Sequence, residues 1–459
     1  MSNGGNSDVK TLIFAYMSLV DFILPVFVLL GLFWSISKLD FFKNGPFSTR
    51  SLQLAFFLRI AMGFGLFLIY SYHYPSRQDA DTFKYFDDSK YMYDAFWTNP
   101  GDYFKMLFGI HCNTEYFNTE YFNNMSNWVR SYDNGLFNDN RLMIRVNAFL
   151  RIFSFGNYHV HSIILAFLAF MGSFSLSKLF FEVSRSKALT YIAVFLVPSL
   201  VFWSSGILKE AVLLAALGFF AYHFYQLFDS NRTWKNYVML FLMSCVLIVL
   251  KLYVFMAFFP AIIIWLVVSK WRRSLWVYLL MYILFIAIAT LIGEINPRYD
   301  FVNLIVDKQK QFIRLADFYP VNSRFDLEVL TYEFWSLLLS SPEAIFNVFT
   351  KPWPNELNSI LYIPSFIENA VILLLLFTTF VYRKALKVKE WDFVIFCLSF
   401  CIILYTVIGL TTPITGAIVR YKIPAIPFLM MAVFMLMDFD KIPIRFTQNK
   451  LSRWINTFL

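Results

Sequence analysis

Two carboxylates separated by a single residue, Asp79 and Asp81, are the first residues in this sequence that could do chemistry. They stand in the segment HYPSRQDAD, directly after a long apolar block, which would hold them at the rim of a membrane. In an extended segment, side chains two residues apart point the same way. The pair could therefore hold a divalent cation such as Mg²⁺ or Mn²⁺, or one carboxylate could act as a general base. The alternative is the solvated acidic start of a loop.

Lys209 and Glu210, in the stretch FWSSGILKE, form a second candidate site. The Ser-Ser-Gly sequence before them predicts a turn followed by the start of a helix. A helix N-terminus has free backbone N–H groups that can bind an anion, and the Lys209 ammonium would add positive charge beside them. The alternative is a Lys–Glu pair whose charged ends reach the membrane surface.

Arg420 and Lys422 flank a tyrosine where the last apolar helix opens, in TGAIVRYKIPAIPF. A guanidinium at this depth suits a phosphate at the level of the lipid headgroups. Lys251 and Tyr253 lie in the middle of another apolar block. The sequence thus predicts one lipid-phosphate or substrate site, formed by Lys209, Glu210, Lys251, Tyr253, Arg420 and Lys422, with the two Asp as catalytic groups and a possible metal site.

Membrane-spanning helices must position these residues. Hydrophobic residues make up 59% of the 459-residue chain and charged residues only 15%, whereas soluble proteins carry about 25% charged residues. The apolar residues come in blocks near the length that crosses about 30 Å of hydrocarbon. The composition predicts an all-α, polytopic membrane protein. It excludes a disordered chain, a disulfide scaffold and a soluble nucleic-acid-binding protein.

One apolar block is too long for a single span. Residues 236–268 would form a helix of about 50 Å, with Lys251 near its middle and Pro260 following. We therefore expect two segments that meet near one membrane face, and about 11 membrane-embedded segments in all. The apolar blocks are 11–37, 51–73, 160–181, 188–203, 207–228, 236–268, 274–293, 360–382, 391–410 and 418–437.

Lys and Arg predict the orientation of these spans, because basic residues concentrate in cytoplasmic loops. If residues 236–268 run out and back, the basic loops all fall on one side, with the N-terminus outside and the C-terminus in the cytoplasm. The loops lie near residues 38–50, 185–187, 232–235, 270–273 and 383–389, with a basic tail after 441. This pattern predicts a multi-pass membrane protein with its basic loops in the cytoplasm.

Two long polar segments, 74–159 and 294–359, would lie on the outer side. Each contains a predicted amphipathic helix, at 142–155 and 327–350. Long polar segments between spans are usually functional. No internal repeat or Pro-rich linker divides the sequence, so residues 1–459 are predicted to form a single membrane domain with ordered outer loops.

Two charges fall deep inside predicted spans, Asp21 in the first and Arg59 in the second. An unpaired charge near the bilayer centre is unfavourable by about 2.5–3.5 kcal/mol or more. We therefore expect a structural ion pair between them.

The outer-face residues resemble motifs of the multi-span glycosyltransferases of the GT-C class. These enzymes use a polyprenyl-phosphate-linked sugar and place an acidic pair in the first large outer loop, where Asp79-Ala80-Asp81 stands here. Many also open a late helix with an Arg-Tyr-Arg-x-Pro-x-x-Pro-like stretch that contacts the lipid phosphate, and RYKIPAIP at 420–427 is similar to it. FWSSGILKE and KPWPNELN also resemble stretches of uncharacterised bacterial membrane proteins of polysaccharide assembly.

The resemblance implies a transferase that moves a sugar from a polyprenyl-phosphate carrier to a glycan or protein acceptor on the outer face of the inner membrane. A polysaccharide polymerase or ligase of envelope glycan assembly is one alternative. A transporter or a non-enzymatic subunit of an envelope complex is another. Transporters usually show broken helices in both halves, and only one such block is seen here.

Overall fold

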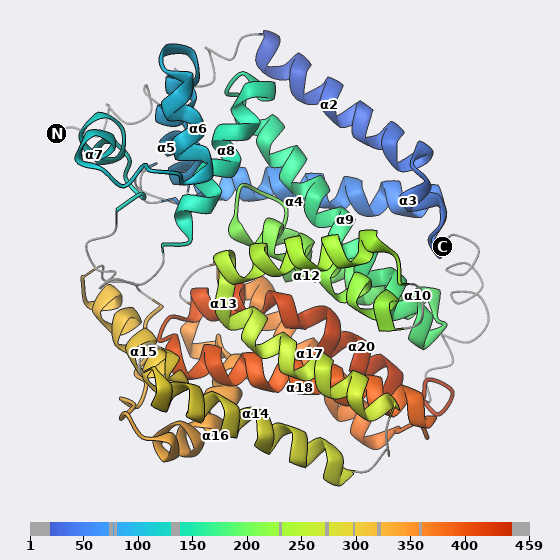
Figure 1. Cartoon of the computed structure of the whole chain (residues 1–459). Helices are drawn as coiled ribbons and strands as arrows, with labels where there is room; N and C mark the ends of the chain where they lie inside the picture. Colours follow the sequence, from blue (N-terminus) through green and yellow to red (C-terminus); the bar gives the residue numbers. More distant parts are fainter. Residues whose placement is uncertain are drawn as a thin grey trace, which may run out of the picture. The chain divides into compact units, whose positions relative to one another are not determined.

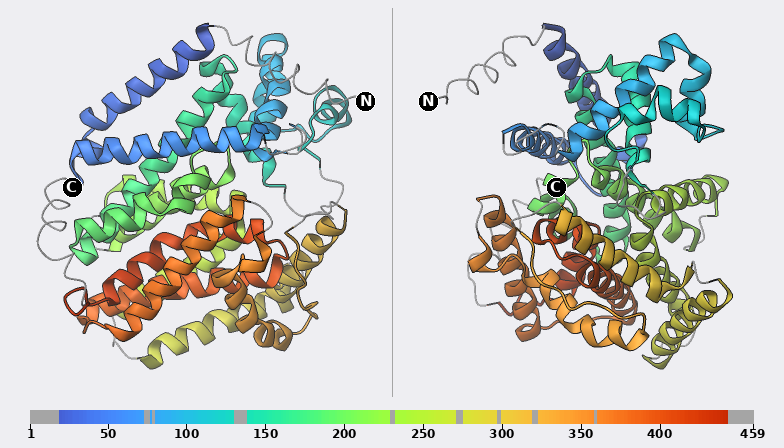
Figure 2. Two further views of the ribbon diagram at one scale, coloured as in Figure 1. Left: turned by 180° about the vertical axis from the view of Figure 1, so that it is seen from behind. Right: turned by 90° about the vertical axis from the view of Figure 1, so that its left-hand side faces the viewer.

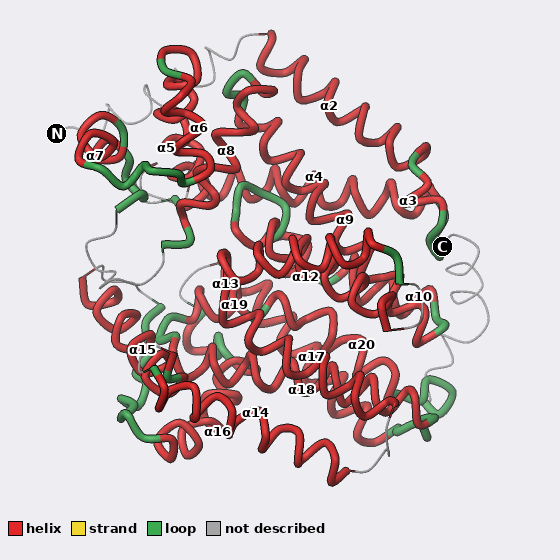
Figure 3. The backbone as a smooth tube through the Cα atoms, in the orientation of Figure 1, coloured by secondary structure: helices red, strands yellow, loops and turns green. Residues whose placement is uncertain are grey.

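The computed structural model describes residues 19–72, 77, 80–129, 138–228, 232–270, 275–296, 299–318, 323–357 and 360–442. These residues form helices and loops, with two isolated β-bridges and no strand (Figure 3). Within this described part, nine helices are long and apolar enough to cross a membrane. The predicted all-α, polytopic membrane fold is confirmed.

The chain divides into two compact units. The first unit comprises Met1–Val129, Asn140–Phe170 and Ser205–Ala211. Its helices are α2 (Leu19–Lys38), α3 (Asp40–Lys43), α4 (Thr49–Tyr72), α5 (Asp81–Thr98), α6 (Pro100–Phe108), α7 (Glu115–Glu120), η2 (Phe122–Asn124), α8 (Asn140–Ser154) and the first part of α9 (Tyr158–Ser184). Helices α5, α6 and α8 pack against one another (Figure 1).

The second unit contains the rest of the chain. Its helices after α9 are α10 (Lys187–Tyr191), the π-helix η3 (Ile192–Leu196), α11 (Pro198–Trp203), α12 (Lys209–Phe228), α13 (Trp234–Lys270), α14 (Leu275–Ile295), α15 (Phe301–Phe318), α16 (Phe334–Thr350), η5 (Pro354–Glu356), η6 (Ile360–Tyr362), α17 (Ile363–Val381), α18 (Val388–Thr411), α19 (Thr415–Tyr421), η7 (Ile423–Ala425) and α20 (Ile426–Leu436). Helices α18 and α20 lie side by side in it, as the view from behind shows (Figure 2).

The long block predicted to split near Lys251 forms α13, whose backbone leaves the helical region at Lys251 with φ −153° and ψ 76°. Asn236, in its first turn, shares a hydrogen bond of 2.7 Å with His223 near the end of α12. The other end of α13 returns to the same place, because Lys270 Nζ lies 4.3 Å from the ring centroid of Phe228. A straight helix of this length would span about 55 Å. Helix α13 therefore runs out and back, as the sequence predicts.

The block at 188–203 is not one regular span. It forms α10, one π-helical turn and α11, separated at Val197, whose ψ of 120° is extended. Pro198 explains the break, because proline lacks an N–H group and disfavours the helical conformation of the residue before it.

Small residues let spans approach closely. A side chain at Gly218 of α12 would place its Cβ 2.0 Å from the carbonyl oxygen of Gly172 in α9, and Gly172 itself faces the backbone of Ala215. Such close backbone contacts are typical of helix pairs in membranes.

In the second unit, the described ends of the spans that flank the predicted basic loops lie near one another, and we call this the basic end. Lys270 meets Phe228 there, the Tyr278 hydroxyl donates to Asp392 at 2.9 Å, and the Lys384 amide donates to the Leu436 carbonyl at 2.8 Å. Helix α18 begins beside these loops and runs 24 residues, or about 35 Å. Its far end receives a hydrogen bond from Gln309 of α15. The second long polar segment thus lies at the end opposite the basic loops, as predicted; which end faces outward stays a prediction.

The amphipathic helix predicted at 142–155 is confirmed as α8. The one predicted at 327–350 begins later, as α16 at Phe334, because residues 325–333 are irregular. A further helix, α15, precedes it and was not predicted. Its charged and apolar residues alternate with helical spacing. Its overall hydrophobicity is low, so it does not stand out as an apolar block in the sequence.

Candidate functional site

Asp81 is the first residue of α5 and belongs to the first unit. The next side chain, Thr82, shares a hydroxyl hydrogen bond of 2.6 Å with Tyr158, which is the first residue of the span α9. The half-buried Asp81 is therefore held at the level where a span begins. Asp79 lies outside the described residues.

Lys209 and Glu210 open α12 and are both buried. Lys209 Nζ lies 5.7 Å from the ring centroid of Tyr85. Tyr85 is four residues after Asp81 on α5, and residues at this spacing are neighbours on one helix face. Two of the predicted site residues, Asp81 and Lys209, thus come together around Tyr85.

Tyr85 was not predicted as a site residue. Its hydroxyl donates a hydrogen bond of 3.2 Å to Asn140 Oδ1 at the start of α8. Residues 74–159 contain many tyrosines, and nothing in the local sequence distinguishes Tyr85 from the others.

Asp88, two turns along α5, fastens the loop that follows α7. Its carboxylate accepts hydrogen bonds from the Ser126 and Asn127 amides at 2.9 and 2.8 Å. Burial raises the pKa of Asp88 above its usual value, although these hydrogen bonds act in the opposite direction. Asp88 is a structural acid, because its exposed fraction is only 2%.

Arg151 is the charged residue at the packed face of α8. Its guanidinium donates to Ser89 Oγ at 2.7 Å and to the Phe86 carbonyl at 2.6 Å. Burial lowers the pKa of Arg151 to about 10, so the side chain stays charged at neutral pH. It ties α8 to α5 and does not reach an open site.

Ser154, His161 and Asn147 have the distances of a nucleophile, a base and an orienting group. Ser154 Oγ lies 2.6 Å from His161 Nε2, and His161 Nδ1 lies 2.8 Å from Asn147 Oδ1. All three side chains have an exposed fraction of 0%. No substrate can reach them in this conformation, so the network has a structural role and connects α8 to α9.

A cluster of cations and rings forms in the second unit, and we call it the Tyr421 cluster. Lys251 Nζ lies 4.1 Å from the ring centroid of Tyr421 and 5.5 Å from that of Tyr253. The half-exposed Arg420 stands over Trp203, with its guanidinium carbon 5.9 Å from the ring centroid. Three separate stretches of sequence thus meet at one place.

The far side of Tyr421 faces α15. The ring of Phe312 lies 6.0 Å from that of Tyr421, and Lys308 Nζ lies 5.2 Å from the Phe312 centroid. The cluster therefore holds positive charge over aromatic rings at the kink of α13 and the end of α19, opposite the basic end. Of the predicted substrate-binding residues, Lys251, Tyr253 and Arg420 meet here.

Lys422 points elsewhere. It is 3% exposed, and its Nζ donates to Asn369 Oδ1 at 2.5 Å. Asn369 Nδ2 in turn donates to the Lys351 carbonyl at 2.6 Å. The neighbouring Glu368 attracts the Lys422 ammonium. In this conformation Lys422 braces the start of α20, and its predicted role toward a ligand stays a prediction.

Glu368 is itself held in place. Its carboxylate accepts hydrogen bonds from the Ser199 amide at 2.8 Å and from the Ser199 hydroxyl at 2.6 Å. The pair Glu368-Asn369 was missed in the sequence, although a carboxylate and an amide inside the apolar block 360–382 are a signal. Polar groups within a span are unfavourable unless they have partners.

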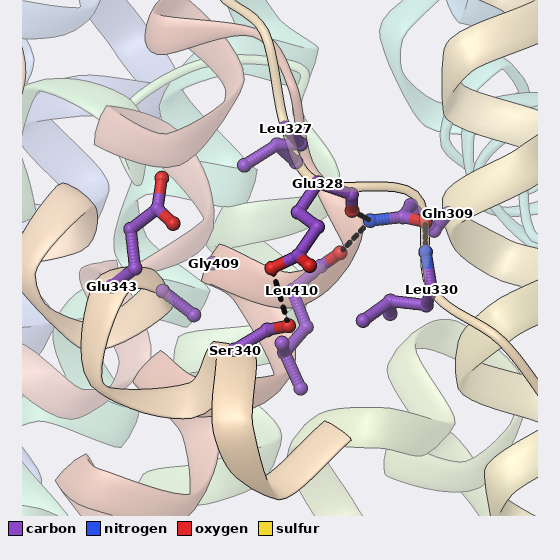
Figure 4. Close-up of a pocket in the computed structure, with 9 residues that line it drawn as sticks. Gln309, Leu327, Glu328, Leu330, Ser340, Glu343, Gly409 and Leu410 are labelled. Atoms are coloured by element: carbon purple, nitrogen blue, oxygen red, sulfur yellow. Dashed lines mark hydrogen bonds between the residues drawn. The ribbon is translucent and has the colours of Figure 1, made fainter. Parts of the chain in front are cut away.

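A small pocket lies between α15, α16 and the end of α18 (Figure 4). Gln309 donates to the Glu328 and Leu410 carbonyls, each at 2.9 Å, and Ser340 donates to the Glu328 carboxylate at 3.2 Å. Glu343 stands on the opposite side of the opening in Figure 4. These hydrogen bonds connect the irregular segment before α16 to the helices, and none of the predicted site residues lines the pocket.

The predicted metal site can be judged only in part. Among the described residues, no group of three or more His, Cys, Asp or Glu side chains is placed to hold a metal ion. Because Asp79 lies outside them, cation binding by Asp79 and Asp81 stays a prediction.

The register of α2 against α4 bears on the predicted Asp21–Arg59 pair. The rings of Phe33 and Phe56 lie 5.2 Å apart, and Gln53 donates to the Phe33 carbonyl. This register places Asp21 about nine residues, or about 13 Å, beyond the level of Arg59 along the helices. The backbone of Asp21 accepts a hydrogen bond from Asn157 beside the start of α9. A direct ion pair stays a prediction.

The site residues thus form two groups, each within one unit. Asp81, Lys209 and Glu210 belong to the first unit, and Lys251, Tyr253, Arg420 and Lys422 to the second. That the two groups line one cleft stays a prediction. No protein-family model, no curated protein and no solved structure matches this chain.

Proposed function

We propose that the protein is a membrane glycosyltransferase of the inner membrane of a bacterium. It would move a sugar from a polyprenyl-phosphate carrier to a glycan or protein acceptor on the outer face. The observation that carries this proposal is the Tyr421 cluster, in which Lys251 and Arg420 stand over aromatic rings at one end of the spans. Cations at headgroup level bind phosphate, and arginine does so with two parallel hydrogen bonds.

Asp81 would act on the acceptor. An acidic side chain held where a span begins can accept a proton from an acceptor hydroxyl arriving from water. The acceptor oxygen would then bond to the anomeric carbon while the bond from that carbon to the phosphate oxygen breaks. The carrier would leave as polyprenyl phosphate, its charge balanced by Arg420 and Lys251. Asp79 would assist Asp81, directly or through a divalent cation.

Carrier binding tests the proposal. The full-length protein in lipid nanodiscs is titrated with a polyprenyl phosphate, and binding is followed by native mass spectrometry. Losing one charged hydrogen-bonding group is worth about 1.5–3 kcal/mol, so Arg420→Ala should weaken binding by at least about tenfold. Arg383→Ala is the matched control, because Arg383 also stands over a ring, that of Trp391 at 4.9 Å, but at the basic end.

Equal binding by the wild type, Arg420→Ala and Arg383→Ala would contradict the proposal. Transfer is tested separately, with membranes that supply the lipid-linked sugars and acceptors of the source cell. Asp81→Asn should lose incorporation of labelled sugar while it keeps carrier binding. Unchanged incorporation in that variant would remove Asp81 from the mechanism.

A further inference from the structure

The packed side of α8 carries polar as well as apolar residues. Its buried apolar side chains are Met143, Ile144, Ala148 and Leu150. Four polar side chains are also buried, and each has a hydrogen-bond partner: Asn140, Asn147, Arg151 and Ser154. A helix on the surface of a water-soluble domain normally turns such polar residues outward, toward water.

The outward side of α8 is an apolar stripe. Leu142, Val146, Phe149 and Phe153 follow one another at spacings of four, three and four residues, which places them along one face. Phe149 is 48% and Phe153 is 60% exposed, and their rings lie 5.4 Å apart. We call these four residues the α8 stripe.

The neighbouring helix α5 carries charged residues on its outward side. Helices α5 and α8 pack directly on each other through Tyr85, Ser89 and their partners. The outward side of α5 carries Lys84, Asp87, Lys90 and Asp94. The two-helix layer therefore has one charged face and one apolar face, as expected of a layer between water and lipid.

The chain connection holds α8 at the membrane surface. Only Phe155, Gly156 and Asn157 separate it from the span α9. Phe155 and Gly156 have φ of 51° and 79°, so the backbone reverses sharply between the two helices. The four Cα–Cα steps from Ser154 to Tyr158 reach at most about 14 Å, and the end of α8 therefore lies within that distance of the first residue of the span α9.

We propose that α8 lies in the membrane interface and that its stripe contacts lipid. An amphipathic helix whose apolar residues are exposed beside the start of a span is suited to the boundary between headgroups and acyl chains. The charged side of α5 then faces water, and Asp81 at the start of α5 sits at the boundary between the two. This inference does not depend on the proposed enzyme activity.

Fluorescence quenching tests the inference on the full-length protein in nanodiscs. Phe149→Cys and Phe153→Cys are each labelled with an environment-sensitive probe, and Lys90→Cys on α5 is the matched control. Cys245, which is exposed, is replaced by Ser, and the other three native cysteines are buried. Leu142→Cys provides a milder substitution in case either Phe variant does not fold.

The stripe probes should be quenched severalfold by lipids that carry a nitroxide on the acyl chain, and hardly by iodide in water. The Lys90 probe should show the opposite. Iodide quenching of the stripe probes equal to that of the Lys90 probe would overturn the inference. Stripe probes that neither quencher reaches would also overturn it, because protein rather than lipid would then cover the stripe.

Discussion

Arg420 and Lys422 are two residues apart, but we expect their substitution to have different effects. Replacing Arg420 should weaken carrier binding, and replacing Lys422 should lower the stability of the protein. Lys422 is 3% exposed, donates to Asn369 and lies near the buried carboxylate of Glu368. Lys422→Ala would remove a buried, charged hydrogen bond and leave Asn369 Oδ1 without its donor, a loss of about 1.5–3 kcal/mol. Arg420 is half-exposed over Trp203, and losing an exposed cation–ring contact is worth about 0.5–1 kcal/mol.

The assay is reversible unfolding by sodium dodecyl sulfate in mixed micelles, which measures the free energy of unfolding. Arg420→Ala should unfold close to the wild type while its polyprenyl-phosphate binding falls. Lys422→Ala should lose about 1.5–3 kcal/mol of stability. The double variant Lys422→Ala/Glu368→Gln removes both charges and, compared with the two single variants, should recover part of the loss, with a coupling energy of about 0.5–3 kcal/mol.

The reasoning is refuted if Lys422→Ala unfolds like the wild type and binds the carrier poorly. Lys422 would then act toward a ligand, as the sequence motif alone implies, and the buried contact with Asn369 would not carry its main role. Additive losses in the double variant would refute the electrostatic link to Glu368.

Three further predictions concern topology, pH and the deep charges. In intact cells, an impermeant maleimide should label Glu120→Cys and not Lys389→Cys, and the reverse result would invert the predicted orientation. Because burial raises the pKa of Asp88 above 3.8, its folded state keeps the proton longer than the unfolded state. The free energy of unfolding of the wild type relative to Asp88→Asn should therefore decrease as the pH rises above about 4, and an increase would mean that the hydrogen bonds to Asp88 outweigh burial. If Asp21 and Arg59 form the predicted ion pair, Asp21→Asn and Arg59→Gln should show a coupling energy above about 0.5 kcal/mol, and losses that add within that limit would refute the pair.

Span lengths and breaks were readable in the sequence because the bilayer imposes a length on every apolar helix. The split at Lys251 follows from a block too long to cross once, with a charge at its middle. Helix α15 and the break before Pro198 were harder to predict from the sequence. The first lacks an apolar block, and the second depends on one proline in a stretch that is otherwise apolar enough to span.

The partners of polar groups were less predictable than the spans. Lys251, Tyr253 and Arg420 meet in one cluster, as expected from their position at the same ends of spans. Lys422 instead finds Asn369 on α17, and this choice depends on helix rotations that one sequence does not reveal. The apolar periodicity of α8 predicted two faces but not which of them packs inward.

The exposed apolar stripe and the buried polar groups of α8 are explained by lipid as its solvent. In water, an apolar stripe drives burial, so the core is apolar and the surface polar. At a lipid interface apolar side chains gain nothing from turning inward, whereas Asn147 and Arg151 must find hydrogen-bond partners away from lipid. The packed face therefore includes these polar side chains beside its apolar ones, and α5 and α9 supply their partners, Ser89 and His161. An acid at the start of α5 is thereby fixed to the membrane surface by groups that are not catalytic, which is the placement that transfer from a lipid carrier to an aqueous acceptor would need.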